Sequence, residues 1–315
     1  MMTRRMFLKR SAAAAGAAAA AGVFASKLLA AEPSTTASAE KMLMRKIPST
    51  GEGLPVVGLG TYNPTNPRQL TDENLAPLAQ VFQTFFDAGG RVVDTAPSYG
   101  TAEQFVGILS QRLKINDKLF IATKVLEHDE QSGVRSFDRS FQRLKRQDKI
   151  DLMQCHNFTA WPTQLKSMRK WKDDGKFRYI GVTHFQDIGH AELERIIKRD
   201  KPDFLQINYS IAEPHAGERL LPAAKDLGLA VMINRPFAAG GLVRSLANKP
   251  LPDFAKPFAD TWAAALLKWI IADEAVTAVL PATGNPKHVR DNVRGGFGPL
   301  PDADTRRRLA AAALA

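Results

Sequence analysis

The chain alternates short apolar segments with segments of helical periodicity, eight times in succession. The apolar segments are unbroken, as in residues 119–124 (LFIATK), and the helical ones carry apolar residues at three- and four-residue steps, as in residues 71–88. Unbroken apolar runs are typical of buried parallel strands. Eight strand–helix units therefore favour an α/β fold, a (β/α)8 TIM barrel. The expected strands are residues 56–60, 92–94, 119–124, 150–156, 179–183, 204–207, 230–234 and 276–280.

A doubly wound open sheet is the alternative architecture. Against it, the first strand is followed by Thr61-Tyr62-Asn63-Pro64 and not by the glycine-rich turn of a dinucleotide-binding unit. Two apolar runs about Gly51-Glu52-Gly53 predict an N-terminal β-hairpin, within residues 47–60, that closes the floor of the barrel. The longest irregular stretch, residues 235–257, is a candidate lid or cofactor clamp. The expected helices are residues 71–88, 102–113, 134–147, 162–174, 188–198, 218–227 and 261–273.

The N-terminus reads as a targeting segment. Arg4-Arg5 stands ahead of Phe7-Leu8 and an uncharged Ala/Gly-rich run, which resembles a twin-arginine export signal. Cleavage after Ala30 or Ala31 is favoured over cleavage after Ala25. We therefore expect a signal peptide over residues 1–31, a flexible linker over 32–45 and the barrel domain over 46–315. A basic amphipathic start and a membrane anchor are the alternatives, but the run is short and alanine-rich for a spanning helix.

Charge and cysteine content restrict the classes of function. Removing residues 1–31 lowers the formal net charge from +11 to +6, because it takes away five basic and no acidic residues. This excess forms no basic run, so a nucleic-acid interface is not expected. Cys155 is the only cysteine, which excludes an intrachain disulfide, and no CxxC or HExxH pattern offers a metal site. The expected location is the periplasm or another exported compartment, with no stable membrane span after cleavage and the twin-arginine export machinery as a partner.

Three consecutive expected strands end in an ionisable residue. Asp94, Lys124 and His156 follow one another at intervals of 30 and 32 residues, one strand–helix unit each, and Tyr99 lies in the loop after Asp94. The carboxyl ends of barrel strands share one rim, so the four side chains should converge there. Each of them singly has a structural alternative, such as a packed ring for Tyr99 or a satisfied core histidine. The four together indicate a catalytic set.

This set suits the reduction of a carbonyl group. Tyr99 would be the general acid, with its pKa lowered by the nearby Lys124 ammonium. Asp94 would keep Lys124 charged and oriented. His156 would donate a hydrogen bond to the substrate oxygen, where negative charge develops in the transition state.

The motifs DTAPSYG, ATK and DLMQCHN, with Gly58-Leu59-Gly60-Thr61, closely resemble the aldo-keto reductase family, over residues 46–292. The resemblance implies a barrel that binds NADP(H), or NAD(H) as the alternative, and acts on a small carbonyl or alcohol substrate. It implies the catalytic tetrad Asp94, Tyr99, Lys124 and His156. The residues that it places at the cofactor are Gly60, Thr61, Asp94, Thr183, Gln206, Thr283, His288 and Asn292.

On the substrate side we expect Tyr62, Asn157 and Trp161, with ordinary packing as the alternative for Trp161 and for Phe237. Arg235 would reach the pyrophosphate or a substrate carboxylate, or form a structural ion pair. The chain departs from the family pattern at His184, at Asn234-Arg235 and at Ala282.

Two readings compete with a redox enzyme. One is an exported cofactor-binding accessory or sensor protein on the same fold with little or no turnover. The other is a non-redox acid/base enzyme on the same barrel, which would bind no dinucleotide.

Overall fold

A computed structural model describes residues 41–62 and 66–315. The expected signal peptide and most of the expected linker lie outside the described residues. Eight parallel strands form one sheet in the order β10-β9-β8-β7-β6-β5-β4-β3. They are β3 (Leu59–Gly60), β4 (Val92–Asp94), β5 (Phe120–Val125), β6 (Ile150–His156), β7 (Phe177–Thr183), β8 (Phe204–Asn208), β9 (Ala230–Asn234) and β10 (Ala278–Val279).

The first and last strands of this sheet meet and close it into a barrel. Parallel bridges join Val57 to Val279 and Gly60 to Ala282, and the Gly60 amide donates to the Pro281 carbonyl at 3.0 Å. A Cβ at Gly60 would lie 2.9 Å from the Leu280 oxygen, so this close approach of two backbones requires glycine. The (β/α)8 barrel predicted from the sequence is confirmed.

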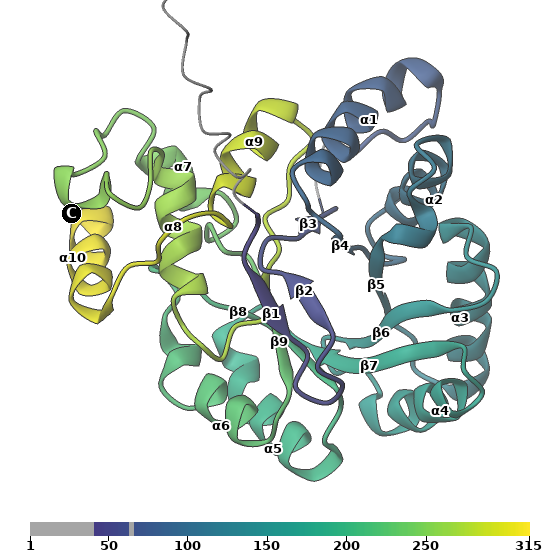
Figure 1. Cartoon of the computed structure of the whole chain (residues 1–315). Coiled ribbons are helices and arrows are strands. Elements are labelled where there is room, and N and C mark those ends of the chain that lie inside the picture. The colour runs from purple at the N-terminus through teal and green to yellow at the C-terminus, as the bar shows by residue number, and fades with distance from the viewer. Residues whose placement is uncertain (1–40, 63–65) are drawn as a thin grey trace, which may run out of the picture. The chain divides into compact units, whose positions relative to one another are not determined.

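Helices surround the barrel strands (Figure 1). The strand-connecting ones agree with the predicted segments to within a few residues. The α-helices of the described chain are α1 (Asp72–Asp87), α2 (Ala102–Arg112), α3 (Glu130–Leu144), α4 (Trp161–Asp173), α5 (His190–Asp200), α6 (Leu220–Asp226), α7 (Gly241–Ser245), α8 (Trp262–Ile271), α9 (Pro286–Arg294) and α10 (Ala303–Leu314).

A two-stranded hairpin lies across the amino-terminal end of the barrel, in front of the barrel strands in Figure 1. Its strands are β1 (Met44–Lys46) and β2 (Gly53–Pro55), which pair antiparallel. Ile47 and Leu54 are buried in the same apolar cluster as barrel residues such as Phe120. The hairpin therefore closes the floor, as the sequence predicted.

The hairpin begins earlier than predicted. Its first strand starts at Met44, inside the segment assigned to the linker, and Met42 is already buried. The sequence does not predict this strand, because two of its three residues, Arg45 and Lys46, are charged and break the apolar pattern. The Arg45 guanidinium donates to the carbonyls of Ile271 and Glu274 at the end of α8, which fixes the strand to the barrel.

The stretch expected to be irregular, residues 235–257, contains α7 and a short 3-10 helix, Asp253–Ala255. The Lys249 ammonium donates to the Ala312 carbonyl in α10 at 2.8 Å. The Trp262 indole donates to the Lys249 carbonyl. Part of this stretch is thus bound to α8 and α10, neighbours that are distant in sequence.

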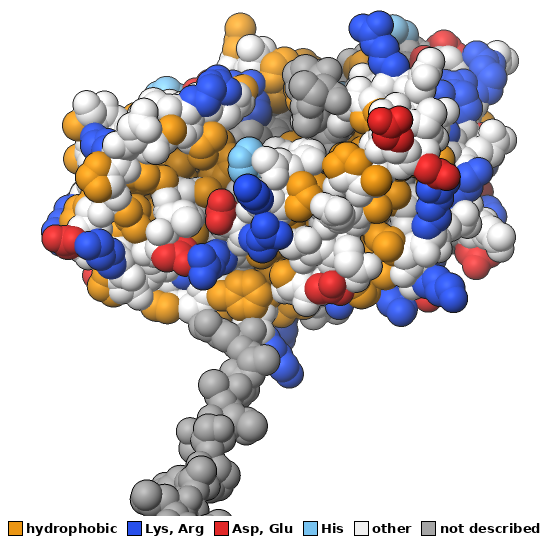
Figure 2. Space-filling view, turned by 90° about the horizontal axis from the view of Figure 1, so that it is seen from above, with side chains coloured by type: hydrophobic (Ala, Val, Ile, Leu, Met, Phe, Trp, Pro, Cys, Tyr) orange, Lys and Arg blue, Asp and Glu red, His pale blue; other side chains and the backbone are white. Residues whose placement is uncertain are grey.

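Acidic and basic side chains are interspersed on the face that Figure 2 shows, without a continuous area of one sign. In the described part of the chain, no helix combines the length and the apolar character needed to cross a membrane. Within residues 41–62 and 66–315, no three His, Cys, Asp or Glu side chains are placed to hold a metal ion together.

Candidate active site

Asp94 and Lys124 form a buried ion pair at the carboxyl-terminal end of the barrel, here called the barrel mouth. Asp94 ends β4 and Lys124 lies in β5, so the parallel pairing of these strands brings the two side chains together. The Lys124 Nζ lies 2.7 Å from Asp94 Oδ2 and donates also to the Thr95 carbonyl at 2.8 Å. Burial is the largest single effect and by itself would lower the pKa of Lys124, but Asp94 and Tyr99 together outweigh it and the pKa is raised. Lys124 therefore stays charged.

Two glutamines bind the other oxygen of Asp94. The Gln206 amide donates to Oδ1 at 2.8 Å, and the Gln154 amide donates to the same atom at 3.3 Å. Gln154 is fully buried and precedes His156 by two residues in β6, so both side chains point to the same face of the strand. Sequence reasoning missed Gln154. Its signal was a polar side chain two residues before His156, on the same face of β6.

Tyr99 lies between the ion pair and His156. The Lys124 Nζ is 4.9 Å from the centre of the Tyr99 ring, and the His156 ring centre is 5.8 Å away. Burial raises the pKa of Tyr99, and although the Lys124 charge acts in the opposite direction, the pKa remains above its ordinary value. The expected lowering of this pKa is therefore wrong, because desolvation of the phenolate exceeds the attraction of the Lys124 ammonium, which Asp94 already neutralises.

His156 is neutral in this site. Burial, together with the charge of Lys124, lowers the pKa of His156 to about 3. The Ser98 hydroxyl lies 3.5 Å from Nδ1. A hydroxyl that donates to Nδ1 leaves the proton of the neutral ring on Nε2, and His156 can then donate from that atom.

Thr61, Thr183 and Gly60 surround Asp94 on the side where the cofactor was expected. The backbone amide and the hydroxyl of Thr61 both donate to the Asp94 carbonyl at 3.0 Å. The Thr183 hydroxyl donates to Gln206 Oε1 at 3.3 Å. Thr61 thus bonds Asp94 directly, Thr183 is connected to Asp94 through Gln206, and Gly60 is the register partner of Asp94 in the pairing of β3 with β4.

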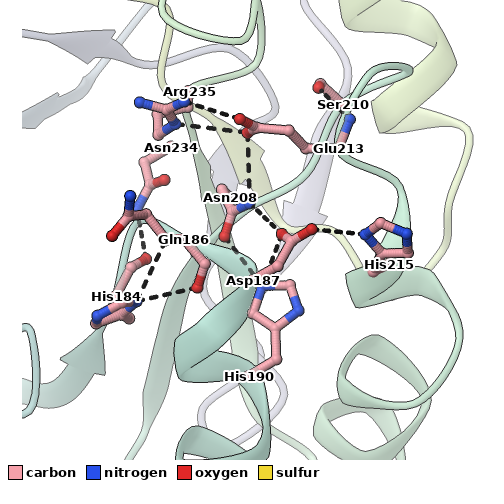
Figure 3. A network of polar contacts seen from close by, with 10 residues as sticks. All are labelled: His184, Gln186, Asp187, His190, Asn208, Ser210, Glu213, His215, Asn234 and Arg235. Atoms are coloured by element: carbon pink, nitrogen blue, oxygen red, sulfur yellow. Dashed lines mark hydrogen bonds and ion pairs between the residues drawn. The ribbon is translucent and has the colours of Figure 1, made fainter.

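A polar network covers the ends of β7, β8 and β9 (Figure 3). The Arg235 guanidinium forms an ion pair with the Glu213 carboxylate, with Nη2 2.8 Å from Oε1. Asn208 donates to both Asp187 and Glu213. The ion pair of Arg235 agrees with the structural alternative weighed for this residue.

His184 and Asn234 join the same network. The Asn234 amide donates to the His184 carbonyl at 3.0 Å, while Asn234 Oδ1 is buried and has no hydrogen-bond partner among the described residues. Asn157, the residue after β6, likewise has a buried Oδ1 without a partner in the described structure. The Oδ1 atoms of Asn234 and Asn157 can therefore accept hydrogen bonds from a ligand at the barrel mouth.

Thr283 and His288 lie at the start of α9, next to a cleft of about 960 Å³. Thr283 Oγ1 lies 3.3 Å from His288 Nδ1 and accepts from the Asn285 amide. Arg68 and Glu73 line the opposite side of this cleft. Asn292, further along α9, is buried. The three residues implied for the adenosine end of the cofactor therefore share one helix and its preceding loop.

Of the three expected substrate-side residues, Tyr62 contacts the tetrad directly. Its ring lies edge-on to Tyr99, with centres 5.0 Å apart. Asn157 adopts a positive φ of 52° directly after His156. Trp161 packs beneath the guanidinium of Arg199, at 4.0 Å, and against the core. This position agrees with ordinary packing for Trp161.

The aldo/keto reductase family model matches residues 56–310. The chain belongs to the aldo/keto reductase family. The sequence prediction of this family is confirmed, and with it the general class of oxidoreductase that acts between carbonyl and alcohol groups. The expected twin-arginine signal lies outside the described residues and stays a prediction.

Relatives in the family cover most of the chain. An aldo-keto reductase of Mycobacterium sp. (strain KMS) is 27% identical over 253 residues, 77% of this chain and 83% of the relative. A glyoxal reductase of Bacillus subtilis (strain 168) is 28% identical over 239 residues, 72% of this chain and 78% of the relative. An aldo-keto reductase of Klebsiella pneumoniae, solved in complex with NADPH, shares the fold at a TM-score of 0.70 with 22% identity, covering 86% and 94% of the two chains.

Proposed function

We propose that this protein is an NAD(P)H-dependent oxidoreductase that interconverts an aldehyde or ketone and an alcohol, with Tyr99 as the general acid. The observation that carries the proposal is the position of Tyr99 between a charged Lys124 and a neutral His156. Lys124 is held by Asp94 at 2.7 Å, and the pKa of His156 is lowered to about 3. Tyr99 can supply a proton, while Lys124 is charged and His156 is neutral, which are the charge states that proton transfer from Tyr99 requires.

The residues at the mouth fit a nicotinamide. A carboxamide has an NH2 donor and a carbonyl acceptor. The buried Oδ1 of Asn234, which has no partner among the described residues, can accept from the donor. Thr183 and Gln206 carry the hydroxyl and amide that would pair with the remaining atoms. We propose that these three residues hold the carboxamide.

The mechanism assigns one task to each tetrad residue. A bound nicotinamide supplies the hydride. Tyr99 donates its hydroxyl proton to the substrate oxygen, and the Lys124 charge stabilises the phenolate that remains. His156 donates from Nε2 to the same oxygen and orients the carbonyl. Asp94 accepts hydrogen bonds from Lys124, Gln154 and Gln206 and keeps Lys124 in place.

NADP(H) is the proposed cofactor, with NAD(H) as the alternative. The Klebsiella pneumoniae neighbours were solved with NADP and NADPH. A relative in Escherichia coli (strain K12), 25% identical, is named an NADH-specific methylglyoxal reductase. In this chain Arg68 and Glu73 place one positive and one negative charge at the cleft beside Thr283. Fluorescence titration with NADPH and NADH measures the preference directly.

Replacement of Tyr99 by Phe tests the mechanism. The Tyr99→Phe variant keeps the ring and loses only the hydroxyl that carries the proton, so turnover should fall by at least about a hundredfold while the affinity for NADPH stays within about twofold. A broad panel of aldehydes and ketones with both cofactors provides the assay. Unchanged turnover in this variant would contradict the role of Tyr99.

An accessory or sensor protein is the second candidate. It is favoured by the departures from the family pattern on the nicotinamide side, His184 and Asn234-Arg235, where the Arg235 side chain is held by Glu213. Native mass spectrometry separates the two functions, because a dinucleotide that stays bound and does not exchange favours the accessory protein. A protein that binds no dinucleotide would instead favour the non-redox acid/base enzyme.

We also propose export by the twin-arginine route, on the sequence of residues 1–31 alone. Replacement of Arg4 and Arg5 by Lys should retain the protein in the cytoplasm of the producing cell. Fractionation with an antibody against the chain checks this, and continued export of the variant would contradict it.

A further inference from the structure

Lysines gather at the floor of the barrel, the end that the hairpin closes (Figure 1). Two turns there, residues 113–119 and 145–149, lead from α2 and α3 into β5 and β6. In a parallel barrel, the turns that precede the strands all lie at the amino-terminal end. The lysines of these two turns and of the hairpin strand β1, here called the floor lysines, are Lys46, Lys114, Lys118, Lys145 and Lys149.

Hydrogen bonds and ion pairs hold these segments side by side. The side-chain amide of Asn116, in the first turn, donates to the Leu144 carbonyl at the end of α3, at 3.1 Å. Arg178, near the start of β7, pairs with both Glu52 of the hairpin and Asp151 near the start of β6. The floor lysines therefore belong to one continuous face, although they come from separate parts of the sequence.

The floor lysines are exposed and have no acceptor in the part of the chain that the structure describes. None of them forms an ion pair or a side-chain hydrogen bond there. The arginines of the same end differ, since Arg45 and Arg91 donate to backbone carbonyls, and Arg146 and Arg178 pair with Asp151. Arginine thus connects the elements of the floor, whereas lysine presents free charge to the solvent.

Acidic residues do not cancel this charge. The two turns contain four lysines and two carboxylates, Asp117 and Asp148. At the opposite ends of β4, β5 and β6, the loops contain no lysine or arginine, and the loop after β5 is acidic; they are residues 95–101, 126–129 and 157–160. Positive charge therefore lies at the floor end of these strands and not at the mouth end. A charge separation of this kind orients a molecule near a surface of one sign.

Two floor lysines occupy backbone positions that favour glycine. Lys114 and Lys145 have φ of 56° and 55°, in the left-handed region. A cation at the end of a helix also gains from the helix dipole, which is the structural alternative for these two residues. The dipole does not account for Lys46 in a β-strand or for Lys149 directly before β6.

The chain enters the described domain at this same end. Met42 is buried beside Gly296, which follows the end of α9, and the Leu43 amide donates to the Gly296 carbonyl at 2.7 Å. Earlier in the sequence, residues 12–25 form an uncharged run rich in Ala and Gly. A chain held at a membrane through that run brings the floor, and not the mouth, toward the lipid. One weak apolar anchor needs a second signal such as a basic surface for stable attachment.

We propose that the floor of the barrel docks on an anionic phospholipid surface through the floor lysines, so that the mouth faces away from the membrane. Ammonium groups on flexible stems, set apart on separate turns, suit a fluid layer of phosphate head groups. A single bound anion would instead require donors that converge. This inference goes beyond the proposed redox function and does not depend on it.

Vesicle sedimentation with the full-length protein tests the proposal. Vesicles of phosphatidylcholine with phosphatidylglycerol should bind the protein at least about tenfold more strongly than vesicles of phosphatidylcholine alone. Raising NaCl from about 0.1 M to about 0.5 M should remove most of this difference, because salt screens the attraction. Equal binding to the two kinds of vesicle, or binding to neither, overturns the proposal.

A quadruple variant locates the effect in the two turns. It combines Lys114→Gln, Lys118→Gln, Lys145→Gln and Lys149→Gln. The matched control removes the same number of positive charges from exposed residues elsewhere, with Lys166→Gln, Lys256→Gln, Arg290→Gln and Arg307→Gln. Binding to the anionic vesicles should fall at least about tenfold in the first variant and no more than about threefold in the control. Equal losses would show an effect of net charge alone and would refute docking through the floor.

Lysine acetylation read by mass spectrometry gives the orientation of the unsubstituted protein. On anionic vesicles the floor lysines should react at least about fivefold more slowly than in the free protein, and Lys166 and Lys256 should change less than about twofold. Unprotected floor lysines contradict the proposal. A short DNA duplex that protects them at a lower concentration than the vesicles would assign this face to nucleic acid. Protection by self-association without lipid would assign it to a second copy of the chain, and either result also refutes the proposal.

Discussion

The neutral state of His156 makes a quantitative prediction about stability and pH. An unfolded chain has an imidazole with the ordinary pKa of 6.5, whereas burial and the Lys124 charge lower the pKa of His156 to about 3 in the folded protein. Between these values the unfolded chain binds a proton that the folded chain does not. Folding stability is therefore lost as pH falls below 6.5, and the loss is complete near pH 3.

The size of the effect follows from the two pKa values. From pH 7 to pH 5, His156 alone should lower the free energy of unfolding by about 2 kcal/mol. Because pH 5 is well above the folded pKa, this figure is set by the ordinary imidazole value and changes little with the depth of burial. Over the same interval the folded protein should keep His156 neutral.

The assay is urea unfolding followed by tryptophan fluorescence at pH 7 and pH 5. Other groups also titrate in this interval, so the informative quantity is the difference between the wild type and His156→Gln, which should lose about 2 kcal/mol less on acidification. The same substitution at the exposed His128 controls for removal of an imidazole as such. Equal pH dependence in the wild type and His156→Gln would refute the conclusion that the tetrad histidine is neutral.

Three further predictions concern the neighbours of His156. Lys124→Met should destabilise the fold by about 3–5 kcal/mol, because it leaves Asp94 buried without its cation, and Lys124→Met with Asp94→Asn should recover part of this loss in urea unfolding. Gln154→Leu removes one of the three side-chain donors to Asp94 and should lower kcat with little change in KM, whereas Gln154→Glu, which adds a second carboxylate, should be worse in both stability and rate. Burial raises the pKa of Tyr99 above its ordinary value of 10, so in the free enzyme the alkaline fall of kcat/KM should lie above pH 10; a fall near pH 8 would show that the ammonium dominates.

The barrel and the convergence of the tetrad were predictable because both depend on local pattern. Unbroken apolar runs fix the parallel strands, and the barrel topology then brings Asp94, Lys124 and His156 to one rim whatever the details of packing. The structure places Lys124 against Asp94 as expected. The start of the hairpin at Met44 was not predictable in this way, because Arg45 finds its partners in α8, far along the chain.

Properties that depend on balance between opposed effects were harder to predict. The charge of Lys124 pointed to a lowered pKa for Tyr99, but the outcome depends on how much of the phenol is desolvated, and only the folded structure determines that. Arg235 was equally compatible with an anion site and an ion pair until Glu213, 22 residues away, appeared beside it. Gln154 was overlooked because a single amide within a strand forms no recognisable motif.

The hairpin at the floor also determines how molecules reach the site. Ile47 and Leu54 fill the amino-terminal end of the barrel, and Glu52 accepts hydrogen bonds from Arg178 and Tyr179 beneath it. Cofactor and substrate must then both enter and leave through the barrel mouth, at the carboxyl-terminal end. We expect the ligand that lies deeper to bind first and to leave last. At saturating substrate, the turnover rate is then limited by the entry and release of ligands through the barrel mouth as well as by proton and hydride transfer.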